Sequence, residues 1–80
     1  MATKNISSPL PGTFYRRSSP DNPPYILEGA HVKEGDIVGL VEIMKTYYEV
    51  KSDTTGTIEN FLVENGDNVT AGQVLVEITT

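Results

Sequence analysis

One lysine near the middle of the chain, Lys45, is the residue best placed to take part in chemistry. It lies within a run from Ile37 to Val50 that is rich in Ile, Val, Tyr and Thr, the residue types that favour β-strands. The run is much longer than a typical strand of about five or six residues, so we expect it to fold back on itself near its centre. That centre is Met44-Lys45, although tight hairpins prefer Asn-Gly or Asp-Gly for their positive φ angles. The sequence therefore predicts a hairpin whose two tip residues are selected for something other than turn propensity.

Other kinds of functional site find little support in the sequence. His31 is the only histidine and has no obvious second ligand, so we expect no metal site there. Neither a phosphate-binding glycine loop nor a hydrolase nucleophile elbow occurs, and no nucleophile–base pair is evident, so we expect no independent catalysis. Glu42 and Glu49 flank the predicted tip on its two strands. They either contribute to solubility or guide an enzyme that docks on the hairpin.

Size and charge exclude several classes of protein. Eighty residues make one domain near the lower size limit for a single hydrophobic core, and the absence of cysteine rules out disulfides and thiolate zinc sites. The net charge of −5 argues against nucleic acid or an anionic membrane as the main partner. No apolar run reaches membrane-spanning length, and the first residues lack the apolar stretch of a signal peptide. We therefore expect a soluble protein of the cytoplasm.

The chain contains two related halves. The pattern Gly-x-x-Val-x-x-Gly-x-x-Val-x-x-Val over residues 29–41 matches Gly-x-x-Val-x-x-Gly-x-x-Leu-x-x-Ile over residues 66–78, at a constant offset of 37 positions. A second match, between residues 12–14 and 56–58, has an offset of 44 positions, so the first half holds seven extra residues. Glycines at these fixed places suit positive φ or close backbone contact. Short strands, frequent turns and the lack of a helical period predict an all-β sandwich or barrel.

Equivalent apolar positions of the two halves are expected to meet in one core. The predicted core residues are Val32, Val38, Val41, Val50, Ile58, Leu62, Val69, Leu75 and Ile78. The extra residues fall within residues 17–24, where three prolines remove backbone donors and exclude a central strand. This segment is either a tolerated surface insertion or a projecting loop stiffened by proline.

Three segments resemble the biotinyl domain of the biotin carboxyl carrier proteins of bacterial-type acetyl-CoA carboxylase. Residues 8–16, Ser-Pro-Leu-Pro-Gly-Thr-Phe-Tyr-Arg, are similar to the opening strand of that family. Ser19-Pro20-Asp21 together with residues 25–29 resembles its protruding thumb and the return from it, and residues 41–45, Val-Glu-Ile-Met-Lys, resemble its attachment hairpin. The resemblance implies a barrel-sandwich hybrid of two four-stranded antiparallel sheets with quasi-twofold symmetry. It implies a domain over residues 8–80 with a thumb-like insertion at about 17–24, after a flexible N-terminal segment over residues 1–7.

The same resemblance implies a function and a set of site residues. Lys45 would carry covalent biotin as an amide, attached by a biotin protein ligase that reads the neighbouring Met44. The rest of the implied attachment site is Ile43, Thr46 and Glu42. The domain would be a carrier without catalytic activity that shuttles carboxyl groups between a biotin carboxylase and a carboxyltransferase, for acetyl-CoA carboxylase and fatty acid synthesis. Its compartment would be the cytoplasm, or a plastid or another organelle if the domain is excised from a longer precursor.

The sequence departs from that family at two places. The attachment motif reads Ile43-Met44-Lys45-Thr46 where the family has Ala-Met-Lys-Met, and Arg17-Ser18 stand where its thumb has threonine-proline. A contact between the thumb and biotin is therefore left open. The thumb residues in question are Arg17, Ser18, Ser19, Pro20 and Asp21.

Two alternative functions share the expected fold. A lipoyl carrier domain of a 2-oxo-acid dehydrogenase complex also presents a hairpin lysine, but its motif has aspartate before the lysine and it lacks a thumb. Met44 and the Ser19-Pro20-Asp21 insertion favour biotin over lipoate. The other alternative is an unmodified adaptor module in which Lys45 is only a solvated hairpin residue.

Overall fold

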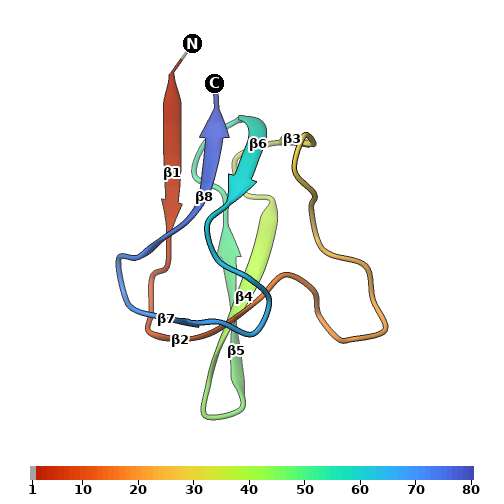
Figure 1. Cartoon of the computed structure of the whole chain (residues 1–80), viewed down its shortest axis with the longest axis vertical. Coiled ribbons are helices and arrows are strands. Elements are labelled where there is room, and N and C mark those ends of the chain that lie inside the picture. The colour runs from red at the N-terminus through yellow and green to blue at the C-terminus, as the bar shows by residue number, and fades with distance from the viewer. Residues whose placement is uncertain (1) are drawn as a thin grey trace.

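The computed structural model describes residues 2–80, which form eight strands and no helix, so the described residues contain no helix able to cross a membrane. The strands are β1 (Thr3–Ser7), β2 (Gly12–Tyr15), β3 (His31–Val32), β4 (Ile37–Ile43), β5 (Thr46–Lys51), β6 (Gly56–Phe61), β7 (Asn68–Val69) and β8 (Val74–Thr79). They pair into two four-stranded antiparallel sheets, ordered β1-β8-β6-β3 and β5-β4-β2-β7 (Figure 1). The predicted all-β fold of two such sheets is confirmed.

The two sheets are related by the repeat seen in the sequence. Exchanging β1 with β5, β8 with β4, β6 with β2 and β3 with β7 converts one strand order into the other. The turn hydrogen bonds follow the same exchange, because the Gly35 N–H donates to the Ser52 carbonyl at 2.7 Å and the Gly72 N–H donates to the Ser8 carbonyl at 2.8 Å. All four glycines of the repeated pattern have φ between 85° and 95°, the left-handed region that glycine enters without a steric penalty. The repeat in the sequence therefore corresponds to a quasi-twofold axis that relates the two sheets.

The N-terminal residues belong to the folded domain. Strand β1 pairs with β8 along its length, and Ile6 lies in the core with 4% of its surface exposed. The prediction of a flexible segment over residues 1–7 is wrong for the strand, and the domain begins before Ser8; Met1 lies outside the described residues. The offset of 44 positions makes Ile6 the equivalent of Val50, so extending the repeat upstream identifies this strand.

One hydrophobic core fills the space between the sheets. Every predicted core residue is buried except Leu62, for which the prediction is wrong because half of its surface, 51%, is exposed. Leu62 follows the last residue of β6, and the next residue, Val63, contributes to the core instead. The buried apolar residues that the prediction missed are Ile6, Phe14, Leu40, Val63 and Val76.

Strands β4 and β5 form a long hairpin with a two-residue tip, as predicted. Ile43 and Thr46 are the last paired residues, and the tip consists of Met44 and Lys45 with φ of 48° and 67°. Two consecutive positive φ angles are what a type I′ turn requires, and Asn-Gly is the pair that supplies them most easily. For other residues the left-handed conformation costs roughly 1–2 kcal/mol each, because Cβ crowds the following carbonyl. The tip is therefore a strained turn that the paired strands hold in place.

The hairpin tip and the chain ends lie at opposite ends of the molecule (Figure 1). Ala2 and Thr80 exchange backbone hydrogen bonds of 3.3 and 2.8 Å. By the repeat offsets this pair is the quasi-twofold equivalent of Ile43 and Thr46, the pair that closes the hairpin. Symmetry thus places Ala2 and Thr80 at the position that the base of the tip occupies in the other half.

The connection from β2 to β3 contains no strand and projects beside the sandwich (Figure 1). The Tyr25 N–H donates to the Arg16 carbonyl at 2.9 Å, which closes the base of a loop over residues 17–24. Within the loop the Asn22 N–H donates to the Ser19 carbonyl at 3.1 Å. We call residues 17–24 the thumb; they coincide with the insertion that the repeat arithmetic locates.

The strained tip leads to a first prediction. Replacing Met44→Asn and Lys45→Gly should raise the free energy of unfolding by about 1 kcal/mol, because these residues adopt the turn conformation at lower cost. Urea unfolding measures the change as a higher midpoint at constant slope. The control, Met44→Ala with Lys45→Ala, removes both side chains but keeps the strain and should not stabilise. A midpoint that is unchanged or lower in the Asn-Gly variant would show that the tip is not strained.

Candidate functional site

Lys45 and Met44 are presented to solvent at the end of the molecule. Met44 has 93% of its surface exposed and Lys45 is also exposed. The ion pairs among residues 2–80 are Arg16–Glu28 and Lys51–Glu49, so the Lys45 amine is not held by a carboxylate. Ile43, which precedes the tip, packs against the core and anchors the hairpin. The arrangement offers a primary amine on a flexible stem, mounted on a backbone that is itself fixed by strand pairing.

One face of the hairpin sheet, the face away from the core, carries a polar and aromatic patch. In the antiparallel register Glu42 lies opposite both Thr13 on β2 and Tyr47 on β5, and residues directly opposite share a face of the sheet. Tyr15 lies on the same face, two residues after Thr13. Partial burial raises the pKa of Tyr15, and the Glu42 carboxylate raises it further by its charge and by accepting a hydrogen bond. Glu42 and Tyr15 are therefore neighbours on this face of the sheet.

The thumb and the hairpin face each other across a groove of about 440 Å³. Small-molecule sites in proteins have volumes of roughly 300–1,000 Å³, so the groove is large enough for a small ligand. Its lining residues are Tyr15, Arg17, Ser18, Ser19, Pro20, Tyr47 and Asn65. The structure therefore brings four of the predicted thumb residues together with the hairpin strand that follows the lysine.

Not every predicted site residue lies in this groove. The predicted site residues that do not line it are Asp21, Glu42, Ile43, Met44, Lys45 and Thr46. Conversely, Tyr15, Tyr47 and Asn65 line the groove but are not among the predicted site residues. Tyr47 could have been found from the hairpin register, because a tip at Met44-Lys45 places it opposite Glu42. Asn65 comes from the β6–β7 connection, and no pattern in the sequence predicts that it lies beside the thumb.

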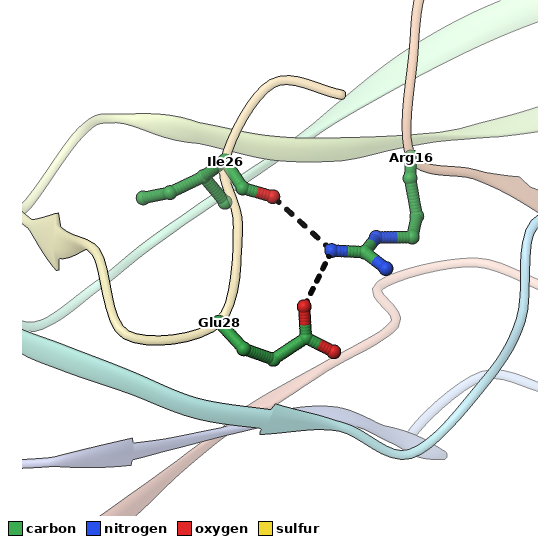
Figure 2. A network of polar contacts seen from close by, with 3 residues as sticks. All are labelled: Arg16, Ile26 and Glu28. Carbon is green, nitrogen blue, oxygen red and sulfur yellow. Dashed lines mark hydrogen bonds and ion pairs between the residues drawn. The ribbon is translucent and has the colours of Figure 1, made fainter. Parts of the chain in front are cut away.

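Arg16 fixes the base of the thumb (Figure 2). Its Nη2 donates to the Ile26 carbonyl at 3.3 Å and forms an ion pair with Glu28 Oε1 at 2.9 Å. Its guanidinium carbon lies 3.9 Å from the centre of the Phe61 ring, a cation–π contact. The Glu28 backbone N–H, and then the Arg16 guanidinium, lower the pKa of the Glu28 carboxyl.

The same arginine also fixes one wall of the groove. The backbone N–H of Arg16 donates to Asn65 Oδ1 at 2.8 Å. Arg16, the residue just before the thumb, therefore connects the return segment after the thumb to the β6–β7 connection. The groove is built on an anchored loop.

Comparison with known proteins identifies the family to which this sequence is similar. The Biotin_lipoyl family model, described as "Biotin-requiring enzyme", matches residues 4–78. The biotin carboxyl carrier protein of acetyl-CoA carboxylase of Pseudomonas aeruginosa is 44% identical over 73 residues, which are 91% of this chain and 47% of that protein. The protein of the same name from Cyanidium caldarium is 40% identical over 74 residues, which are 92% of this chain and 49% of that protein. The chain thus spans about half the length of these curated relatives.

The solved structures give the same picture of the fold. The crystal structure of the urea carboxylase of Kluyveromyces lactis superposes with a TM-score of 0.79 and 29% identity, over 99% of this chain and 6% of that one. A domain with this fold is therefore one small part of that much longer chain. Because the family match extends over nearly the whole sequence and the structure has the sheets and hairpin lysine that the resemblance implies, the chain belongs to the Biotin_lipoyl family.

Proposed function

We propose that this domain is the biotin carrier of an acetyl-CoA carboxylase and that biotin is attached to Lys45. The observation that supports this most directly is the tip itself, where Met44 and Lys45 occupy an exposed turn that suits other residues better. The similarity to proteins named biotin carboxyl carrier protein supports the choice of cofactor and reaction. The domain then acts without a reaction of its own, as a carrier for partner enzymes.

Lys45 and the residues around it have different roles in the attachment of biotin. The amine forms the amide with the carboxyl group of biotin, and a ligase must hold the activated acyl group close to that amine. Met44, with 93% of its surface exposed, is the residue that a ligase contacts next to the lysine. Ile43 and Thr46 form the closing pair that sets the direction of the tip, and Glu42 lies in the sheet directly behind this pair.

The groove beside the hairpin fits the head group of biotin. The Tyr15 and Tyr47 rings offer faces for an apolar bicyclic ring, and Ser18, Ser19 and Asn65 offer hydrogen-bonding groups for a ureido group. When bound, biotin supplies a ureido nitrogen that accepts and releases a carboxyl group. The chain's own part is to hold that head group, orient it, and release it to partner enzymes.

The partners follow from the carrier role. We propose a biotin protein ligase, a biotin carboxylase and a carboxyltransferase, in the cytoplasm or in an organelle where these enzymes work. A tethered group reaches both enzymes at a high effective concentration without a free cofactor pool. The lipoyl alternative is less well supported, because the thumb and Met44 have no counterpart in the pattern typical of lipoyl carriers.

The position of the amine leads to a second prediction. In the double variant Lys45→Thr with Thr46→Lys, composition and net charge are kept, but the amine moves from the tip to the first residue of β5. Side chains of a strand alternate between faces, so the amine is both displaced and redirected. We expect a normal fold by circular dichroism and at least a hundredfold slower biotinylation by a biotin protein ligase, since small misplacements of this kind cost about that factor. Streptavidin blots and intact mass measure the labelling, and equal labelling of both proteins would rule out geometric recognition of the tip.

The thumb leads to a third prediction. Because Arg16 and Tyr25 are already joined by a backbone hydrogen bond, Asn-Gly can replace residues 17–24 as a two-residue turn. We expect the β-sheet spectrum, the melting temperature and the biotinylation of Lys45 to be preserved, while carboxyl transfer by the partner carboxylase falls. A variant with residues 17–24 replaced by a Gly-Ser loop of equal length separates loop length from side-chain contacts. Unfolding would show that the thumb is structural, and unchanged transfer would show that it has no role at the cofactor.

A further inference from the structure

Arg17 lines the groove without a partner of its own. Its Nε is shielded from solvent and has no hydrogen-bond partner within residues 2–80, and neither ion pair of this part of the chain includes it. A shielded donor without an acceptor is costly, and the chain's net charge of −5 offers many carboxylates that could have paired with it. The Nε of the neighbouring Arg16 also lacks a partner, but the guanidinium of Arg16 is neutralised by Glu28 through Nη2. The groove therefore contains a cation that the protein itself leaves unneutralised.

The other groups on the thumb side of the groove are also donors. The Asn65 amide oxygen is occupied by the Arg16 N–H, which leaves the Asn65 NH₂ group available. The Ser18 oxygen accepts a hydrogen bond from the Asn22 side chain at 2.5 Å, which leaves the hydroxyl hydrogen of Ser18 available. A site with one guanidinium and two free donors is matched by a carboxylate, which only accepts hydrogen bonds.

The groups on the hairpin side have the opposite character. Glu42 is a carboxylate, and it lies on the same sheet face as Tyr15 and Tyr47, the two rings that form this side of the groove. An anion entering the groove is repelled there and attracted to Arg17 on the thumb. The charge arrangement therefore orients an anionic ligand across the groove.

We propose that the groove is a carboxylate site, in which Arg17 binds the carboxyl group carried by the cofactor on Lys45. The inference rests on the proposed function and adds to it a preference of the carrier for its loaded state. The unloaded head group has no negative charge to pair with Arg17. Tyr47 lies two residues beyond Lys45, a span of at most roughly 7 Å, so the groove is within reach of a lysine stem extended by an acyl chain. The loaded group is therefore held against the thumb more tightly than the unloaded group.

The test uses the full chain, biotinylated at Lys45 and labelled with ¹⁵N. The loaded form is made with a biotin carboxylase, ATP and ¹³C-bicarbonate, and is compared with the unloaded form by NMR. We expect the Arg17 Nε–H resonance to shift in the loaded form only. In Arg17→Gln the ratio of docked to free carboxyl group should fall about tenfold or more, the loss expected for one hydrogen bond to a charged group. Arg17→Lys should restore part of it, and Lys33→Gln, which removes an exposed cation outside the groove, should change nothing.

Two results would overturn the inference, and they have different meanings. If Lys45 is biotinylated and loaded but the Arg17 resonance is the same in both forms, the carboxylate site is wrong and the carrier function stands. If intact mass shows that a biotin ligase adds nothing to Lys45, the carrier function and the carboxylate site are both wrong.

Discussion

The ladder between β4 and β5 is the interaction on which the function of this domain depends. It holds Met44 and Lys45 in a left-handed turn that neither residue favours, and so presents the lysine on a fixed backbone instead of a flexible loop. The strain is sustained because the inner residues of the hairpin, Val41 and Val50, are buried in the core of the sandwich. A domain of this size can therefore display one reactive amine at a defined place without a large active site around it.

Quasi-twofold symmetry explains the placement of that amine. Each half contributes the same four kinds of strand. In one half the tip joins the neighbouring strands β4 and β5, whereas the equivalent strands β8 and β1 of the other half are paired but not joined. The insertion of the thumb into only one half breaks the symmetry on the hairpin side. Tyr15, Tyr47 and the thumb then enclose a groove beside the hairpin. One asymmetric loop on a symmetric scaffold is sufficient to create this groove.

Much of the fold was predictable from the sequence because regular spacing of residue types indicates the strands and turns. The spacing of glycines and valines revealed both halves, and the β-rich run around Lys45 revealed the hairpin. The start of the domain was missed because Thr3–Ser7 is a mostly exposed edge strand with only Ile6 buried, so its apolar signal is weak. Leu62 was misassigned because the repeat does not report where β6 ends. The groove could not be predicted, since Asn65 and Arg17 come to it from two connections that carry no periodic pattern.

The claim that Lys45 is the point of biotin attachment is tested most directly by the intact mass of the chain. The chain is coexpressed with a biotin protein ligase in one culture and with a lipoate ligase in another, and modified peptides are sequenced by mass spectrometry. The account predicts one added biotinyl group, located on Lys45, in the first culture and an unmodified chain in the second. An unmodified chain with the biotin ligase, a lipoyl group on Lys45, or biotin on a different lysine would contradict it.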